Sequence, residues 1–382
     1  MAAMIDNEKS LEELVWAITI APGRFSLIFA RCNYISLREQ QVQHLHKNCS
    51  VPIREITLQP SANKLYSQIQ AELGEEKPSA VMVLGLESVK EPNIDDLLSS
   101  MNQVREEFRK NCPFPLVLWV NDEIVRKLLR QAPDLESWGK YTVFVRSTDN
   151  LLKFLQQKSD HLFDKVLDTG AECFLSNEEI LGPHSYQELY AASRDLTKSA
   201  QQLPPDLEAC LQFAQGRARD CLDDAIRDYQ QSLWFWQQSN NFVRQGVLYF
   251  HIGLCHYRQG QLDRTNSQEH WQKAKDSFEE CLKCFQQEKR DDLVAKFSVQ
   301  KGKALRRLKQ WDELKKLASK SLKLAKKYNL TPQIAQNHGF LAQVALERKQ
   351  WRPAKQQAEK ALKNLHTLPT QQHHDQGLYL LL

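Results

Sequence analysis

The stretch KQWDELKKLASKSL (residues 309–322) returns 40 residues later as KQWRPAKQQAEKAL (residues 349–362). Counted from Leu314 in the first copy and Ala354 in the second, small or apolar residues stand at steps 0, 4, 7 and 8. Those steps share one face of an α-helix, so each copy predicts an amphipathic helix. The same spacing surrounds Ala225 and Ala274, with nine residues inserted between these two anchors. The sequence therefore predicts one helix used four times with a period of 40 residues.

A partner helix precedes each of these helices. Gly302 and Ala342 stand twelve residues before the last two anchors, and Gly253 matches them once the insertion, near residues 261–272, is counted. Small residues at these positions allow two helices to cross closely. The first unit has Phe213 instead, which predicts a divergent first helix. Helix pairs that repeat at such a period cannot bury their apolar faces alone, and they stack into an α-solenoid.

The small–aromatic–small pattern resembles the tetratricopeptide repeat over residues 206–382. The resemblance implies four helix pairs and a terminal half-repeat, with loops longer than those of the usual 34-residue repeat. We expect the half-repeat either to cap the array or to continue into a longer one. The resemblance also implies a concave face, lined by the first helix of each pair, that binds peptides or protein surfaces.

The residues expected on that face lie at steps −6, −3, +1 and +4 from the small crossing residue of each first helix. Those we expect to bind a partner are Val247, Phe250, Leu254, Tyr257, Lys296, Lys303, Arg306, Gln336 and Gln343. The set joins an apolar and aromatic patch to three cations, so we expect a protein partner with an acidic, partly apolar segment. The alternative is that the aromatic side chains pack against an adjacent helix.

Charge is divided unevenly along the chain. Residues 289–366 hold 20 Lys and Arg against 6 Asp and Glu, a net charge of +14, while the rest holds 31 against 41, a net charge of −10. A basic end favours an anionic partner, although a solvated lysine-rich surface explains it equally well. Nucleic acid is the less favoured partner, because aromatic residues are not interleaved with the basic run.

The N-terminal region alternates short apolar runs with helical periods, which predicts an α/β domain with a parallel sheet over residues 10–165. The expected strands are 25–31, 53–58, 80–84, 116–120 and 141–145, and the expected helices lie near 36–46, 62–73, 93–109 and 122–131. Ser36 with Glu39, and Asn93 with Asp96, have the spacing of helix caps.

Several stretches of this region resemble the N-terminal domain of cyanobacterial-type tetratricopeptide proteins that look like signalling NTPases of the STAND class. They are FSLIFARCNY (25–34), AVMVLGLES (80–88), NQVREEFR (102–109), PLVLWVND (115–122) and APDLESW (132–138). The resemblance implies a RecA-like sheet, with residues 80–87 in the Walker B position and 116–121 in the sensor position. Glu87 then resembles a catalytic carboxylate, although a single Glu at a strand end is more often a surface residue.

The phosphate loop of such NTPases is missing. The pattern GxxxxGK(S/T) places glycine backbone and a lysine against the phosphates, but the residues after Ala30 read RCNYISLRE. We therefore expect a nucleotide-free pseudo-NTPase and no enzyme activity, with a nucleotide-dependent switch as the alternative. No residues stand at the spacing of a metal site or of another cofactor site.

Glycines and prolines punctuate residues 166–205, which predicts a linker with a bridging helix that opens at Ser185 and Glu188. No run approaches the 18 apolar residues of a membrane-spanning helix, so we expect no membrane insertion. Nine scattered cysteines without paired spacing predict reduced thiols in the cytoplasm. The function expected from the sequence is a cytoplasmic scaffold or adaptor, with a nucleic-acid-binding regulator as an alternative.

Overall fold

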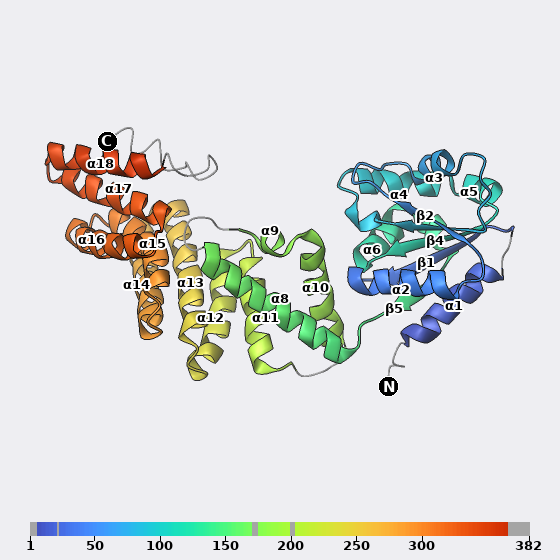
Figure 1. Cartoon of the computed structure of the whole chain (residues 1–382), viewed down its shortest axis with the longest axis horizontal. Coiled ribbons are helices and arrows are strands. Elements are labelled where there is room, and N and C mark those ends of the chain that lie inside the picture. The colour runs from blue at the N-terminus through green and yellow to red at the C-terminus, as the bar shows by residue number, and fades with distance from the viewer. Residues whose placement is uncertain (1–5, 21–22, 170–174, 199–202, 366–382) are drawn as a thin grey trace. The chain divides into compact units, whose positions relative to one another are not determined.

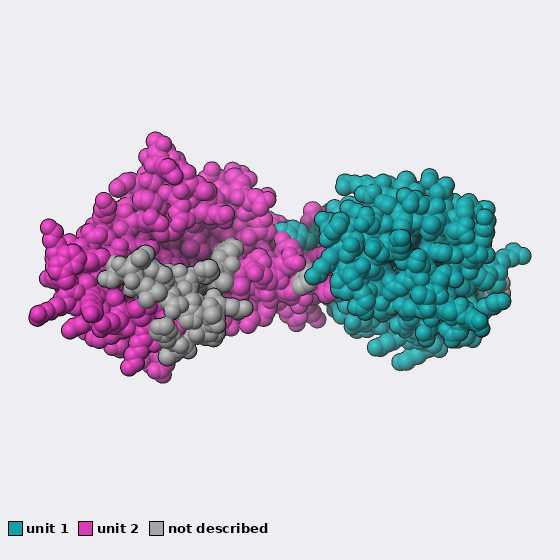
Figure 2. Space-filling model, turned by 90° about the horizontal axis from the view of Figure 1, so that it is seen from above, with its two compact units in different colours: residues 1–151, 190–194 teal, residues 152–189, 195–382 magenta. Residues whose placement is uncertain are grey.

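A computed structural model describes residues 6–20, 23–169, 175–198 and 203–365 of the chain (Figure 1). The chain forms two compact units, coloured separately in Figure 2. Unit 1 comprises residues 1–151 with 190–194, and unit 2 comprises residues 152–189 with 195–382. The predicted terminal half-repeat, residues 366–382, lies outside the described residues. No helix in the described ranges has the length and apolar character needed to cross a membrane.

Unit 1 is built on a parallel sheet. Its strands are β1 (Ser26–Cys32), β2 (Ile53–Thr57), β3 (Ala80–Leu84), β4 (Pro115–Val120) and β5 (Gly139–Phe144), in the order β2-β3-β4-β1-β5. Every residue of β4 is buried, as expected for an apolar strand in a sheet covered on both faces. The five predicted strands and their parallel pairing in one sheet are confirmed, and β4 lies between β1 and β3.

The helices of unit 1 mostly follow the strands. They are α1 (Asn7–Thr19), α2 (Ile35–Asn48), α3 (Leu65–Leu73), α4 (Asn93–Gln103), α5 (Arg105–Asn111), α6 (Asp122–Gln131) and the short α7 (Pro133–Glu136). The sequence did not predict α1, which holds the edge strand because Ser10 Oγ donates to the Val143 carbonyl at 2.9 Å. The helix predicted near 93–109 is two helices, because the backbone leaves the helical conformation at Val104, with φ of −99° and ψ of 20°.

Both predicted caps in unit 1 are wrong. Helix α2 begins at Ile35 after Tyr34 without a side-chain cap, and Ser36 Oγ instead accepts a hydrogen bond from Arg146. Helix α4 begins at Asn93 itself, after Pro92 and again without a side-chain cap. The spacing of a capping box was present in both places, but the backbone entered the helix one or two residues earlier.

Unit 2 contains the four predicted helix pairs. They are α11 (Pro205–Arg217) with α12 (Leu222–Gln238), α13 (Phe242–Leu262) with α14 (Ser267–Gln287), α15 (Asp291–Arg307) with α16 (Trp311–Lys327), and α17 (Thr331–Glu347) with α18 (Trp351–Leu365). Before them stand α8 (Thr148–Thr169), α9 (Asn177–Leu181) and α10 (Pro183–Lys198). Helix α10 begins at Pro183, so Ser185 is not its cap; Ser185 Oγ accepts from Lys158 Nζ at 3.0 Å.

The extra length of this repeat lies in its helices, which corrects the expectation of long loops. Helices α15, α16 and α17 have 17 residues each, and the turns between them have three. In the second pair, both helices have 21 residues, so the insertion lengthens α13 and α14 instead of forming a loop. Longer helices bury more surface per pair, which suits an array whose stability comes from contacts between neighbours.

The small residues at the predicted crossings are required by close packing. A Cβ atom on Gly253 would lie 2.6 Å from the ring of Phe278, and one on Gly302 would lie 2.5 Å from the ring of Phe340. The residues seven steps after each anchor are all buried, namely Ser232, Cys281, Ser321 and Ala361. Because neither crossing leaves room for a larger side chain, the predicted register of the repeat is confirmed.

Five turns of unit 2 have the same geometry. A non-glycine residue with φ between 52° and 56° follows the helix end in each, namely Asn240, Lys289, Lys309, Asn329 and Lys349. The next residue donates its N–H to a carbonyl five residues back, as Gln310 does to Leu305 at 3.0 Å. This is the Schellman motif, which satisfies carbonyls at the helix end. One turn type therefore serves both within pairs and between pairs.

Candidate partner-binding groove

Two of the predicted partner-binding residues lie in the core. Val247 is fully buried, and Phe250 is only 4% exposed. The Phe250 ring meets the edge of Phe297 at a centroid distance of 4.7 Å and also contacts Phe278. Both predictions are wrong, because the face of α13 that carries these side chains packs against α14 and α15, as the alternative interpretation had it.

The side chain of Lys296 forms hydrogen bonds within the chain. Its Nζ atom donates to the carbonyl oxygens of Leu167 and Asp168, both at 3.1 Å. These carbonyls belong to the last turn of α8, where a cation is favoured by the helix dipole and by the unpaired carbonyl groups. Lys296 therefore caps α8, and its binding to a partner stays a prediction.

The other predicted residues are partly accessible. Lys303, Arg306, Gln336 and Gln343 are half-buried on α15 and α17. In the described part of the chain, Lys303 and Arg306 take part in no ion pair. They stand three residues apart on one helix, so their side chains lie on the same face. Two cations of the predicted stripe of three thus remain available to a partner.

Leu254 and Tyr257 border a cavity of about 330 Å³ between α11, α12 and α13. Both side chains are half-buried. On the rim, Arg307 Nε of α15 approaches the Tyr257 hydroxyl at 3.4 Å. Tyr257 therefore joins the lining of this cavity to α15.

A buried arginine–histidine pair stands in the wall of this cavity. Arg217 Nη1 lies 2.6 Å from His251 Nε2, and His251 Nδ1 lies 2.9 Å from the Val247 carbonyl. Since arginine can only donate, Nε2 accepts and Nδ1 carries the proton, which fixes a neutral tautomer. Burial and the nearby Arg217 charge hold the pKa of His251 well below its usual range.

Arg217 itself keeps its charge at neutral pH, because burial lowers its pKa only to about 10. It also donates to Asn177 Oδ1 at 2.8 Å and to the Leu175 carbonyl. The sequence did not single out Arg217. Its acceptors Leu175 and Asn177 stand about 40 residues earlier in the chain, so no local pattern reveals them.

The positive charge of the basic end lies mainly on second helices. Every Lys and Arg of α16 and α18 is exposed, and these are Lys315, Lys316, Lys320, Lys323, Lys326, Lys327, Arg352, Lys355, Lys360 and Lys363. Among the first helices, α15 carries the predicted Lys303 and Arg306, while α17 between Thr331 and Glu347 has no Lys or Arg. The charge count therefore overstates the positive charge on the predicted groove.

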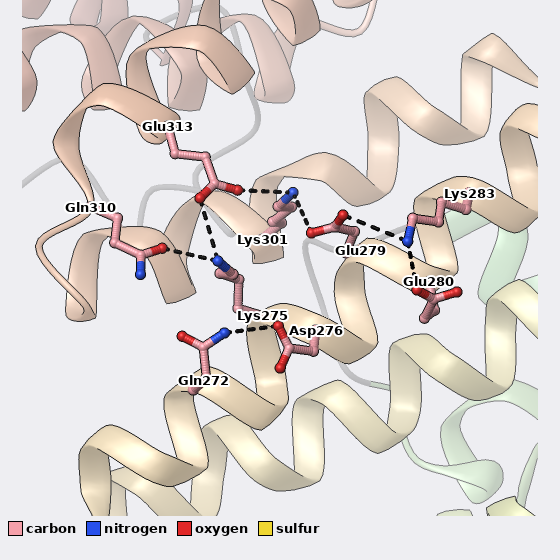
Figure 3. A network of polar contacts seen from close by, with 9 residues as sticks. All are labelled: Gln272, Lys275, Asp276, Glu279, Glu280, Lys283, Lys301, Gln310 and Glu313. Atoms are coloured by element: carbon pink, nitrogen blue, oxygen red, sulfur yellow. Dashed lines mark hydrogen bonds and ion pairs between the residues drawn. The ribbon is translucent and has the colours of Figure 1, made fainter.

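Two lysines, Lys301 of the basic end and Lys275 just before it, form ion pairs that link neighbouring helices (Figure 3). Lys301 Nζ of α15 lies 3.2 Å from Glu279 of α14 and 3.3 Å from Glu313 of α16. Lys275 of α14 reaches the same Glu313 at 3.4 Å. The hydrogen bond from Lys301 lowers the pKa of Glu279 despite partial burial. These bridges link three consecutive helices, at about 0–1 kcal/mol each because the carboxylates are partly exposed.

In unit 1, ion pairs gather where β1 ends and α6 begins. Asp122, at the start of α6, bonds to Arg31 at 2.5 Å and to Arg194, and its N–H donates to Asn33 Oδ1 at 2.9 Å. Burial alone would raise the pKa of Asp122, but the two arginines lower it.

Glu87, which follows β3, is paired as well. Its carboxylate accepts from Arg38 Nη1 of α2 at 2.6 Å, and the side chain is only 5% exposed. The sequence favoured a surface residue at this position, and the structure shows a buried one, because α2 places Arg38 over the end of β3. Among the described residues, no three His, Cys, Asp or Glu side chains gather as metal ligands would.

Comparison with known proteins gives little beyond the fold. No protein-family model matches the chain, and no curated protein matches it. Among solved structures, the crystal structure of the apo form of RapI is similar over 61% of this chain and 68% of that chain. The TM-score is 0.45 and the sequence identity is 16%. The assignment of unit 2 as a helical-repeat array rests on its own four helix pairs.

Proposed function

We propose that this protein is a scaffold or adaptor whose helical repeats bind an acidic, partly apolar segment of a partner protein. The observation that carries the proposal is the pair Lys303 and Arg306, which are accessible on α15 and take part in no ion pair within the described ranges. Leu254 and Tyr257 border a cavity among the first two helix pairs. All eight described cysteines are free thiols, which supports a reducing compartment such as the cytoplasm.

We further propose that unit 1 is a pseudo-NTPase that holds no nucleotide. The chain lacks the glycines and lysine of a phosphate loop after Ala30. Glu87, which resembles the catalytic carboxylate of such domains, pairs with an arginine of the same unit. Unit 1 would then act as a folded attachment for the repeats or as a second binding surface.

Selection of random peptides displayed on phage against the full chain tests the scaffold proposal. We expect enriched peptides to combine Asp or Glu with Leu, Phe or Tyr. Reversing two charges, Lys303→Glu with Arg306→Glu, is expected to weaken their binding. Lys315→Glu with Lys326→Glu makes the same change in net charge on α16, away from the predicted face, and is the matched control. Selected peptides without acidic residues, or equal losses in both double variants, would contradict the proposal.

The exposed cations of α16 and α18 favour nucleic acid as a second candidate partner. A nucleic-acid duplex would show log affinity falling with log salt by about 0.9 per phosphate contacted. Mobility shifts with random DNA and RNA across a salt series separate the two candidates. We expect complexes only at low salt, with none at about 0.15 M, the physiological ionic strength. A tight complex at that salt concentration would make nucleic acid the preferred partner.

A further inference from the structure

The cavity between α11, α12 and α13 has the size of a small ligand site. Its volume of about 330 Å³ lies at the lower end of the range for ligand pockets, about 300–1,000 Å³. The space suits one apolar side chain together with a neighbouring polar group, but it is too small for a large cofactor. Since the cavity lies among the first two helix pairs, it is also separate from the basic helices α16 and α18.

One part of the wall is apolar. Ala225 and Tyr229 of α12 are each 2% exposed, and Leu254 of α13 stands opposite them in the lining. The thiol of Cys255 is also apolar in character, because burial raises its pKa to about 12 and keeps it protonated. This part favours an aliphatic or aromatic group that leaves water.

The polar part of the wall is cationic. Three arginines line the cavity, and no Asp or Glu stands among its described lining residues. Arg219 forms an ion pair at 2.7 Å with Asp228, and Asp228 does not line the cavity. Arg258 is exposed and forms no ion pair with any residue that the structure describes. A carboxylate at the rim would therefore meet Arg258, with the charge of the buried Arg217 behind it.

The buried part of the site is held in place before any ligand arrives. Arg217 donates to Asn177, to the Leu175 carbonyl and to His251, and His251 in turn donates to the Val247 carbonyl. Side chains fixed by several hydrogen bonds lose little conformational freedom when a ligand binds, so more of the contact energy appears as affinity. This arrangement differs from a chance depression between exposed side chains.

We propose that this cavity is an anchor site for a two-residue motif of the partner segment. An apolar side chain enters between Leu254 and Tyr229, and an adjacent Asp or Glu carboxylate binds Arg258. The inference rests on the proposed scaffold function. It says that the acidic and apolar residues of the partner segment bind to the first two helix pairs. The occupant is an internal segment of a protein, recognised by its side-chain carboxylate.

Two blocked peptides test the proposal with the full chain. The probe acetyl-Gly-Leu-Glu-Gly-amide carries only a side-chain carboxylate, and acetyl-Gly-Leu-Gln-Gly-amide is its neutral match. Line broadening of the leucine methyl signals in the peptide NMR spectrum reports weak binding. We expect the Glu peptide to bind about fivefold more tightly, the upper end for one exposed ion pair. A third probe with a free carboxylate, acetyl-Gly-Gly-Leu, is expected to bind more weakly than the Glu peptide.

Variants of the chain locate the binding. Arg258→Gln is expected to remove the preference for the Glu peptide, and Leu254→Trp is expected to fill the cavity and abolish binding of all three probes. Arg264→Gln, an exposed arginine in the turn before α14, is the matched control and is expected to change nothing. Thermal melting shows whether Leu254→Trp still folds, while Arg258→Gln tests the proposal without disturbing the core.

Several outcomes would overturn the anchor site. They are equal binding of the Glu and Gln peptides, no binding of any probe at millimolar concentration, tighter binding of the free-carboxylate probe, or unchanged preference in Arg258→Gln. Peptides selected on the full chain that depend on Lys303 and Arg306 but not on Arg258 would refute the anchor while leaving the scaffold function intact. If the selection yields no acidic peptides at all, both the anchor site and the proposed scaffold function are refuted.

Discussion

Lysine stands at three of the five turn positions where the backbone is left-handed. Lys309 is one of them, with φ of 56°. A left-handed conformation costs an L-residue roughly 1–2 kcal/mol, whereas glycine adopts it freely. The chain tolerates this cost because the Schellman hydrogen bonds at the end of α15 require the conformation.

Replacing Lys309 by glycine is therefore expected to stabilise the protein. We expect Lys309→Gly to gain about 0.5 kcal/mol, after the greater freedom of glycine in the unfolded chain is counted, and Lys309→Val to lose about 1–2 kcal/mol. Urea unfolding of full-length variants measures both. As a control, Lys315→Gly in the middle of α16 is expected to lose about 1 kcal/mol. Equal losses for the two glycine variants would show that the turn conformation carries no strain.

The neutral His251 makes stability depend on pH. The pKa of His251 is lowered in the folded state. Its full contribution to the free energy of unfolding is therefore present above the ordinary pKa, about 6.5, and is lost as the pH falls below that value. One such group gives a slope of up to about 1.4 kcal/mol per pH unit. We expect His251→Gln to flatten the loss of stability between pH 6.5 and pH 5, measured by urea unfolding. Parallel pH profiles for the two proteins would contradict this.

At the scale of helices, the crossing of α15 and α17 is the most sharply defined contact. Gly302 lies so close to the Phe340 ring that a Cβ atom would stand 2.5 Å from it. We expect Gly302→Val to destabilise the protein by about 1–3 kcal/mol through overpacking. In a Phe340→Ala background the same substitution is expected to cost much less, which a double-mutant cycle measures. Additive losses would show that the two residues do not share this contact.

The sequence predicts elements well where one pattern decides them. Strands such as β3 and β4 are short buried apolar runs, and the repeat aligns four helix pairs by the small residues that their crossings require. Helix starts were less predictable, because the backbone before Ser36 and Asn93 enters the helix without using their side chains. The break between α4 and α5 lies in the backbone conformation of Val104, which the apolar periodicity does not encode.

The groove was predicted only in part for a related reason. Helical spacing shows which side chains share a face but not what packs against that face. Phe250 is buried by Phe297 of the next pair, and Lys296 is drawn to the end of α8, far away in the sequence. Arg217 was missed because the first pair departs from the repeat, and Arg258 was missed because it stands five residues after Gly253, outside the predicted steps.

At the scale of the whole molecule, the two units differ in what they can bind. Unit 1 has a parallel sheet, lacks the pattern of a phosphate loop after Ala30, and pairs the carboxylates of Asp122 and Glu87 with arginines. We expect no heat of binding when the full chain is titrated with magnesium and ATP or GTP. An active phosphate-loop NTPase in the same calorimeter is the positive control. A single site per chain with a micromolar dissociation constant would contradict the pseudo-NTPase proposal.

The identical LysGlnTrp turns bear on how the array changes length over evolution. A join from Lys309 to Gln350 would delete 40 residues, rebuild the same turn and connect α15 to α18 in place of α16. Recombination between the two stretches of DNA that encode this turn therefore removes or duplicates a whole pair in frame, without creating a new junction. Relatives of this protein can differ in the number of their helix pairs while each remaining turn keeps its geometry.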